Sequence, residues 1–279
     1  MPVRGSKVLV SDGPTPRAIL LDASEADALC KKAQSVILLG ETAERTYFAV
    51  GLQTIEKSAV GDQADPRRFR HLREVAALLE RREAGLLAYA TAMTYWHQRN
   101  RFCGDCGSAT TSSLSGHVRI CTGSQCGRHH FPRTDPAIIV RVTHRDRCLL
   151  GRQPTWPEGL YSVVAGFVEP GESVEAAVVR ELREETGIRV TAIRYHSSQP
   201  WPFPSSLMLG FAAEATSTAI RLHDGELEEA RWLSREDIVS EVEEGILQFP
   251  SKISISHRLI ADWFNCGSVG CLSQYVGSR

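Results

Sequence analysis

The chain has 279 residues, of which 42% are hydrophobic and 23% are charged, and its net charge is −1. This composition is typical of a folded protein long enough for two domains, and the near-zero charge excludes a broad basic field for nucleic acid or anionic lipid. No apolar run approaches the roughly 20 residues of a membrane span and no secretory signal is visible, so we expect a cytoplasmic protein with no membrane partner.

The first part of the chain, residues 1–100, is expected to form a β-rich domain that ends in helices. Short apolar runs such as KVLV, SVILLG and TYFAVGL are separated by Gly, Pro, Asp and Thr, which is typical of strands and turns. Apolar residues then recur at helical spacing within residues 68–99. Gly85 is expected to divide this stretch into two helices, because glycine weakens a helix interior.

Residues 101–133 are expected to form a small module built around cysteines. Four thiols occur in two pairs, one spaced C-x-x-C and one C-x₄-C: Cys103, Cys106, Cys121 and Cys126. In a reducing compartment, thiols at this spacing resemble the Zn²⁺ ligands of a structural zinc ribbon. The longer second pair leaves two alternatives open. His129 or His130 could replace Cys126, or the module could pack as a loop without metal.

Residues 134–279 are expected to form a second domain of mixed strands and helices. Strand-like runs AIIVRV, CLLGRQ and YSVVAGFV precede a strong helix over 173–186, and LMLGFAAEA and EARWLS follow it. The polar segment 216–229 is expected to be a loop, and a closing helix is expected near 253–264.

The helix over 173–186 carries an unusual concentration of negative charge. Ser173 is a suitable N-cap, Gly187 stands where a helix usually ends, and an apolar stripe faces the core. Three glutamates at i, i+3 and i+4 are expected on another face: Glu181, Glu184 and Glu185. Like charges at this spacing destabilise a helix unless a divalent cation such as Mg²⁺ or Mn²⁺ neutralises them. The alternative is a solvated acidic surface beside Arg180 and Arg183.

The wider pattern decides between these interpretations. Gly166, five residues, Glu172, seven residues and then RELREETGI, residues 180–188, match the Nudix box at every defining position. Seven fixed letters at usual frequencies give chance odds on the order of 10⁻⁹ per start position. The segment therefore resembles the Nudix hydrolase family, whose members hydrolyse a nucleoside diphosphate linked to another group.

The resemblance implies a metal site on a strand–loop–helix element within an α/β/α sandwich. Glu181 and Glu185 would bind Mg²⁺ or Mn²⁺, with the carbonyl of Ala165 as a further oxygen ligand. Glu184 would serve a second metal or help to activate water, and Arg180 would orient the carboxylates by ion pairing. The expected fold is α+β: this sandwich, preceded by the β-rich domain and the zinc-ribbon-like module.

The segment SQPWPFPSSLM, residues 198–208, indicates the substrate. Its alternating prolines and aromatics predict a stiff extended stretch, and packing of the aromatics alone is the structural alternative. Beyond a Nudix helix it closely resembles the SQPWPFP array of the NADH pyrophosphatase branch. By resemblance, the dinucleotide pocket is lined by this segment and two further residues: Phe131, Gln199, Pro200, Trp201, Pro202, Phe203, Pro204, Ser205, Ser206 and Ser256.

A second match to this branch is DGELEEARW, which begins at Asp224. Its Glu226 aligns with a metal-binding glutamate outside the box. Glu228 and Glu229 lie close in sequence, so an ordinary acidic loop or an alignment shifted onto one of them is the alternative.

The leading functional hypothesis is hydrolysis of NADH to reduced nicotinamide mononucleotide and AMP, which the resemblance extends to removing NAD caps from RNA 5′ ends. A homodimer that shapes the pocket is expected from the family. One alternative is a Nudix hydrolase for an ADP-sugar or a dinucleoside polyphosphate. The other is a zinc-ribbon module that binds nucleic acid beside an inactive Nudix domain, which the intact box and the absence of basic runs disfavour.

Overall fold

The computed structural model of the chain describes residues 1–53, 67–223 and 225–276. The chain divides into two compact units, which are described separately. The first unit contains Met1–Thr134 and Trp201–Ser205. The second unit contains Asp135–Pro200 and Ser206–Arg279. None of the described helices is long and apolar enough to cross a membrane.

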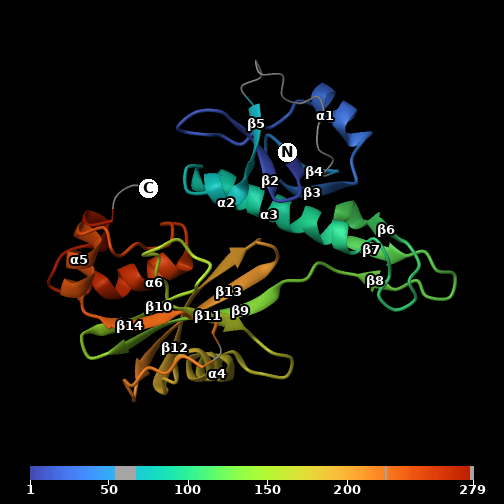
Figure 1. Cartoon of the computed structure of the whole chain (residues 1–279). Helices are drawn as coiled ribbons and strands as arrows, with labels where there is room; N and C mark the ends of the chain where they lie inside the picture. The colour runs from blue at the N-terminus through green and yellow to red at the C-terminus, as the bar shows by residue number, and fades with distance from the viewer. Residues whose placement is uncertain (54–66, 224, 277–279) are drawn as a thin grey trace. The chain divides into compact units, whose positions relative to one another are not determined.

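The first unit contains a five-stranded sheet in the order β3-β4-β1-β2-β5. One core forms where Leu87, Ala90 and Met93 of α3 pack with Val8 and Ile37 of the sheet. The elements of this part are β1 Pro2–Arg4, β2 Lys7–Ser11, α1 Ala23–Cys30, β3 Ser35–Glu41, β4 Thr46–Leu52, β5 Arg67–His71, α2 Leu72–Val75 and α3 Arg81–Arg99 (Figure 1).

The predicted helix break at Gly85 is wrong. Helix α3 runs through this residue without interruption, and the break lies between α2 and α3, at residues 76–80. A mid-helix glycine costs only about 1 kcal/mol relative to alanine, which burial of the apolar face of α3 outweighs. Helix α1, N-capped by Asp22, lies within a stretch whose sequence indicates strands and turns only.

The cysteine module of the first unit is a three-stranded sheet of β6 Thr110–Ser113, β7 Val118–Cys121 and β8 His129–His130, with a 3₁₀ turn at Leu114–Gly116. A buried polar contact joins it to α3. Arg119, which is 8% exposed, donates from Nη1 to His97 Nδ1 at 2.9 Å. His97 Nε2 in turn donates to the carbonyl of Gly116 at 2.7 Å, so the module is held at a fixed place on α3.

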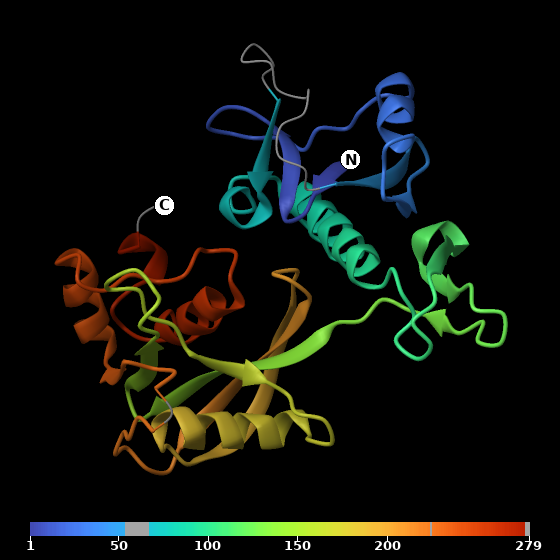
Figure 2. The same ribbon diagram turned by 45° about the vertical axis from the view of Figure 1, so that its right-hand side comes forward.

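The second unit is an α/β/α sandwich, as the sequence predicts. Its sheet has the order β12-β13-β9-β10-β14, with β11 also paired to β9. Figures 1 and 2 show α4 covering one face of this sheet and α6 covering the other. Alternate residues of β9 serve the two cores: Ile138 and Val140 pack with α4, and Ile139 packs with α6.

The elements of the second unit agree with the predicted helices at 173–186 and 253–264. Helix α5 is not predicted, although Ser234 and Asp237 form the capping box that precedes it. The elements are β9 Asp135–His144, β10 Arg147–Arg152, β11 Val164–Phe167, α4 Val174–Thr186, β12 Val190–Trp201, β13 Ser206–Ala215, β14 Glu229–Leu233, α5 Arg235–Glu243, α6 Ile255–Phe264 and a 3₁₀ turn at Leu272–Gln274.

Candidate active site

Helix α4 is fixed at both ends by the residues that the sequence indicates. The Ser173 hydroxyl accepts a hydrogen bond from the backbone N–H of Ala176 at 3.2 Å, and Gly187 ends the helix with φ of 69°, a conformation that favours glycine. Ala177 and Leu182 are fully buried in the core against the sheet. The helix therefore holds its glutamates on a rigid frame.

The three glutamates of α4 differ in their burial. Glu181 and Glu185 are only 9% and 3% exposed, whereas the Glu184 side chain is 54% exposed. Burial raises the pKa of Glu181, and the negative charges of Glu226 and Glu184 raise it further. Two carboxylates that are held out of water beside other carboxylates form a site with a strong demand for positive charge.

Arg180 supplies part of that positive charge. Its Nη1 lies 2.9 Å from Glu181 Oε1 and 3.1 Å from Glu184 Oε2. Its Nε and Nη2 donate to the two carboxylate oxygens of Glu172, each at 2.9 Å, and Nη2 also donates to the Phe167 carbonyl at 2.8 Å. The bidentate pair lowers the pKa of Glu172. Arg180 therefore ties the helix to the strand and loop before it, and fixes where the carboxylates point.

Strand β11 brings the backbone close to the Glu181 carboxylate. Ala165 and Gly166 lie in this strand, opposite Ile139 and Ile138 of β9. A Cβ atom built on Gly166 would overlap the Glu181 carboxylate, so glycine is required for this approach. The donors around this point are carboxylate and backbone carbonyl oxygens, which fit a hard divalent cation such as Mg²⁺ or Mn²⁺.

Three glutamates lie at the start of β14 and in the loop before it, and they differ in their contacts. Glu228 is ion-paired with Arg152, and Glu229 accepts a hydrogen bond from the Tyr161 hydroxyl at 2.6 Å. Glu226 is the member whose negative charge acts on Glu181. This charge effect makes Glu226 a candidate for the further carboxylate of this site. Asp224, the first residue of the matching sequence, lies outside the described residues.

At the end of β12, Gln199 is used to hold helix α6. Its amide nitrogen donates to the Ile253 carbonyl at 2.5 Å, and its amide oxygen accepts from the Ile255 backbone N–H at 2.8 Å. Ser256 is the next residue of α6 and is 2% exposed. Its hydroxyl lies 2.6 Å from that of Ser162. The structure thus brings Gln199 and Ser256 to one place, the N-terminus of α6.

The aromatic residues of the predicted pocket belong to the first unit. The Trp201 and Phe203 rings meet edge to face with centroids 5.1 Å apart, and the Arg73 guanidinium lies 5.8 Å from the Trp201 ring. Phe203 is half-buried against the core of this unit. Phe131 is 54% exposed, so its ring is open to a ligand.

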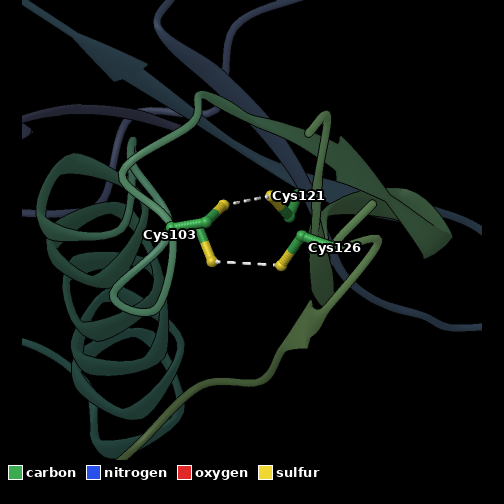
Figure 3. A group of neighbouring side chains, drawn as sticks. Cys103, Cys121 and Cys126 are labelled. Atoms are coloured by element: carbon green, nitrogen blue, oxygen red, sulfur yellow. Dashed lines mark hydrogen bonds between the residues drawn. The ribbon is translucent and has the colours of Figure 1, made fainter. Parts of the chain in front are cut away.

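The four cysteines converge on one point. Their sulfur atoms all lie within 4.8 Å of one another, with 3.8 Å between Cys103 and Cys126 and 3.4 Å between Cys106 and Cys121. Figure 3 shows Cys103, Cys121 and Cys126 directed toward one another. Zn–S bonds of about 2.3 Å would place tetrahedral sulfurs about 3.8 Å apart, whereas a disulfide needs about 2.05 Å. The arrangement fits a four-thiolate zinc site.

The backbone explains how a C-x₄-C pair serves such a site. The two extra residues are taken up by a turn in which the Cys126 N–H donates to the Gly123 carbonyl at 3.0 Å. The Gly123 N–H also donates to the Cys121 sulfur at 3.3 Å, which stabilises a thiolate there. Among the described residues, neither His129 nor His130 joins the cluster, so the histidine alternative is not supported.

Family models match the chain in three consecutive segments. Residues 1–96 match an NADH pyrophosphatase-like rudimentary NUDIX domain, residues 98–131 match an NADH pyrophosphatase zinc ribbon domain, and residues 132–253 match a NUDIX domain. Over 274 residues, 94% of this chain, it is 38% identical to the NAD-capped RNA hydrolase NudC of Mycobacterium bovis, covering 80% of that protein. The chain belongs to the NADH pyrophosphatase branch of the Nudix family.

Other members of the family share shorter regions with this chain. It is 45% identical over 175 residues, 63% of its length, to the NAD-capped RNA hydrolase NudC of Pseudomonas aeruginosa. It is 41% identical over 229 residues, 78% of its length, to the NAD-capped RNA hydrolase NUDT12 of Macaca fascicularis. The chain spans 59% and 50% of the lengths of these two relatives.

Two features of this chain are not evident from its sequence. The N-terminal domain resembles the family only in length and strand content, yet it matches the rudimentary NUDIX model. Ser162, the partner of Ser256, lies in an unremarkable YSVV stretch, and only the folded contact reveals it. Helix α5 differs from these two features, because the Ser234 and Asp237 of its capping box can be recognised in the sequence.

Replacing Gly166 by alanine is expected to lower kcat for pyrophosphate hydrolysis about 100-fold while the protein stays folded. The added Cβ overlaps the end of a flexible side chain, so the Glu181 carboxylate must move away from its site. Steady-state kinetics and thermal melting measure the two effects. Gly85→Ala is the matched control, because nothing lies within 4 Å of the added Cβ and the helix should gain stability. Normal kcat in Gly166→Ala would contradict this role of Gly166.

Proposed function

We propose that the chain hydrolyses the pyrophosphate bond of NAD(H), both as the free dinucleotide and as the 5′ cap of RNA. Water forms a bond to one phosphorus and the bridging P–O bond breaks. The free dinucleotide gives nicotinamide mononucleotide and AMP, and the capped RNA gives nicotinamide mononucleotide and an RNA with a 5′-monophosphate. The observation that carries the proposal is the complete box on β11, α4 and the loop between them: Glu181 and Glu185 are buried, and Arg180 bridges Glu172, Glu181 and Glu184. The relatives named NAD-capped RNA hydrolases support the choice of substrate.

A divalent cation, Mg²⁺ or Mn²⁺, would supply neutralisation of the pyrophosphate charge and activation of the attacking water. Glu181, Glu185, Glu226 and the Ala165 carbonyl would hold it. Glu184, whose side chain is half-exposed and hydrogen-bonded to Arg180, is positioned to contribute to a second metal or to accept the proton of the attacking water. Arg180 holds Glu172, Glu181 and Glu184 in place through four donor contacts.

Zinc has a separate role in this proposal. Four thiolates leave no open position for substrate or water, so the ion at Cys103, Cys106, Cys121 and Cys126 is structural. We further propose a cytoplasmic homodimer, on the family resemblance alone. Sedimentation of the purified protein tests for the dimer. The expected particle mass is twice the chain mass of 30.8 kDa.

A substrate panel tests the proposal against other Nudix activities. NADH, NAD⁺, an ADP-sugar and a dinucleoside polyphosphate are compared by kcat/KM under one metal concentration. We expect NAD(H) to be preferred. A preference for the ADP-sugar or the polyphosphate would assign the chain to another nucleotide.

Phe203 is expected to contribute to binding of the dinucleotide. Phe203→Ala should raise KM for NADH about tenfold, because loss of a stacking platform is worth about 1–3 kcal/mol per base. Hydrolysis of a minimal pyrophosphate substrate should change much less. Since Phe203 also packs against the core of the first unit, Phe203→Leu is the control that retains apolar packing without a ring. Normal KM in both variants would leave Phe203 with a packing role only.

A further inference from the structure

A groove runs along the outer side of α4, on the side opposite its buried core face. It has a volume of about 1230 Å³ and lies within the second unit. One wall is the exposed face of the helix, including Val179 and Arg183, and the other includes Ser217 and Arg221 from the segment after β13. Arg180 and Glu184 also line it, so the groove begins at the carboxylate cluster.

Three exposed arginines give the groove its charge. Arg183 comes from the helix, Arg189 from the residues just after it, and Arg221 from a segment more than thirty positions later. Within the described ranges, no carboxylate forms an ion pair with any of the three. Other arginines of the same unit, Arg152 and Arg231, are paired with glutamates. The three arginines therefore form a cationic group with no ion-paired carboxylate among the described residues, and the acidic side chains of the groove, Glu172 and Glu184, are both paired with Arg180.

The groove wall is held in place by the backbone. The Arg221 N–H donates to the Thr186 carbonyl at 2.8 Å, and the Arg189 N–H donates to the Ser217 hydroxyl at 3.0 Å. Trp232 donates from its ring nitrogen to the Thr218 carbonyl at 3.0 Å. A cation near a helix C-terminus stabilises the helix, which accounts for Arg183. Helix stabilisation does not explain why Arg221, which lies on a separate segment, lines the same groove.

We infer that this groove binds the phosphodiester backbone of a single-stranded RNA whose 5′ cap is held at the glutamate cluster. The inference rests on the proposed function and deepens it. A free dinucleotide ends at its own ribose and base, whereas a capped RNA continues as a chain with one negative charge per nucleotide. Guanidinium groups bind such phosphates well, and three of them line the same groove as Arg180 and Glu184 of the carboxylate cluster.

The test compares two substrates in three proteins. The substrates are NADH and an NAD-capped 20-nucleotide RNA. The proteins are the unaltered chain, the triple variant Arg183→Ala/Arg189→Ala/Arg221→Ala, and the control Arg194→Ala, an exposed arginine of β12 outside the groove. In the triple variant, the ratio of kcat/KM for RNA to that for NADH should fall about tenfold. The slope of log kcat/KM for RNA against log salt should become less steep by about 2, at roughly 0.7 per phosphate.

Several outcomes would overturn the inference. They are an unchanged ratio in the triple variant, an equal fall in the Arg194→Ala control, or cleavage of NADH without cleavage of capped RNA. Should the unaltered chain cleave neither substrate, the proposed function fails, and the groove is tested by fluorescence anisotropy of a 5′-phosphorylated 20-nucleotide RNA. A roughly tenfold weaker Kd in the triple variant would support the groove, and an equal Kd would contradict it.

Discussion

Glu185→Gln protein is expected to fold normally and to hydrolyse NADH at least about 100-fold more slowly than the unaltered chain. The substitution keeps the shape of the side chain but removes the negative charge that would hold the metal, and a lost electrostatic contact at a transition state costs about 10²–10³ in kcat. Glu181→Gln should behave in the same way. Initial rates of AMP release at saturating Mg²⁺ or Mn²⁺ give the comparison.

Glu175→Gln is the matched control for these two variants. Glu175 lies in the first turn of the same helix and is exposed to solvent. Its replacement should change kcat less than about twofold, because only a weak helix-dipole contact is lost. Near-normal turnover in folded Glu181→Gln or Glu185→Gln would remove these residues from the metal site.

Cys103→Ser is expected to lose bound zinc and to lower the free energy of unfolding by more than about 4 kcal/mol, because binding energy at a structural metal site is folding energy. Cys103 is buried, and its sulfur belongs to the four-thiol cluster. Elemental analysis should give one zinc per chain in the unaltered protein and almost none in the variant. Thermal melting should show the loss of stability in the same samples.

Cys266→Ser is the control for the zinc prediction, since Cys266 is exposed and lies outside the cluster. It should retain one zinc and an unchanged melting temperature. A preparation of the unaltered protein that is free of zinc yet stable and active would mean that the module has lost its metal, with the C-x₄-C spacing as the cause.

Helix α4 could be predicted from the sequence because every local signal agrees. Ser173 caps it, Gly187 ends it, and the apolar stripe through Leu182 has the helical period. Gly85 shows where local reasoning fails. The cost of a glycine is small and visible in the sequence, whereas the packing that offsets it comes from strands far away in the chain.

The carboxylate site was only partly predictable, because it too depends on contacts with distant parts of the chain. The box identifies Glu181 and Glu185, and their pattern alone suggests one charged face. Burial against the sheet separates them from the exposed Glu184. The ion pair of Glu228 depends on Arg152, which lies on a strand more than seventy residues earlier. Sequence neighbours carry no information about such a contact.

We propose that this chain cleaves the pyrophosphate of NAD(H) at the α4 glutamates with the help of a divalent cation. The most direct measurement is product analysis of NADH incubated with zinc-loaded protein, with Mg²⁺ or Mn²⁺ and with excess chelator. We predict AMP and reduced nicotinamide mononucleotide in equal amounts, formed with either metal, absent with chelator and nearly absent in Glu185→Gln. Failure to form AMP with either metal, or equal rates in Glu185→Gln, would contradict the claim.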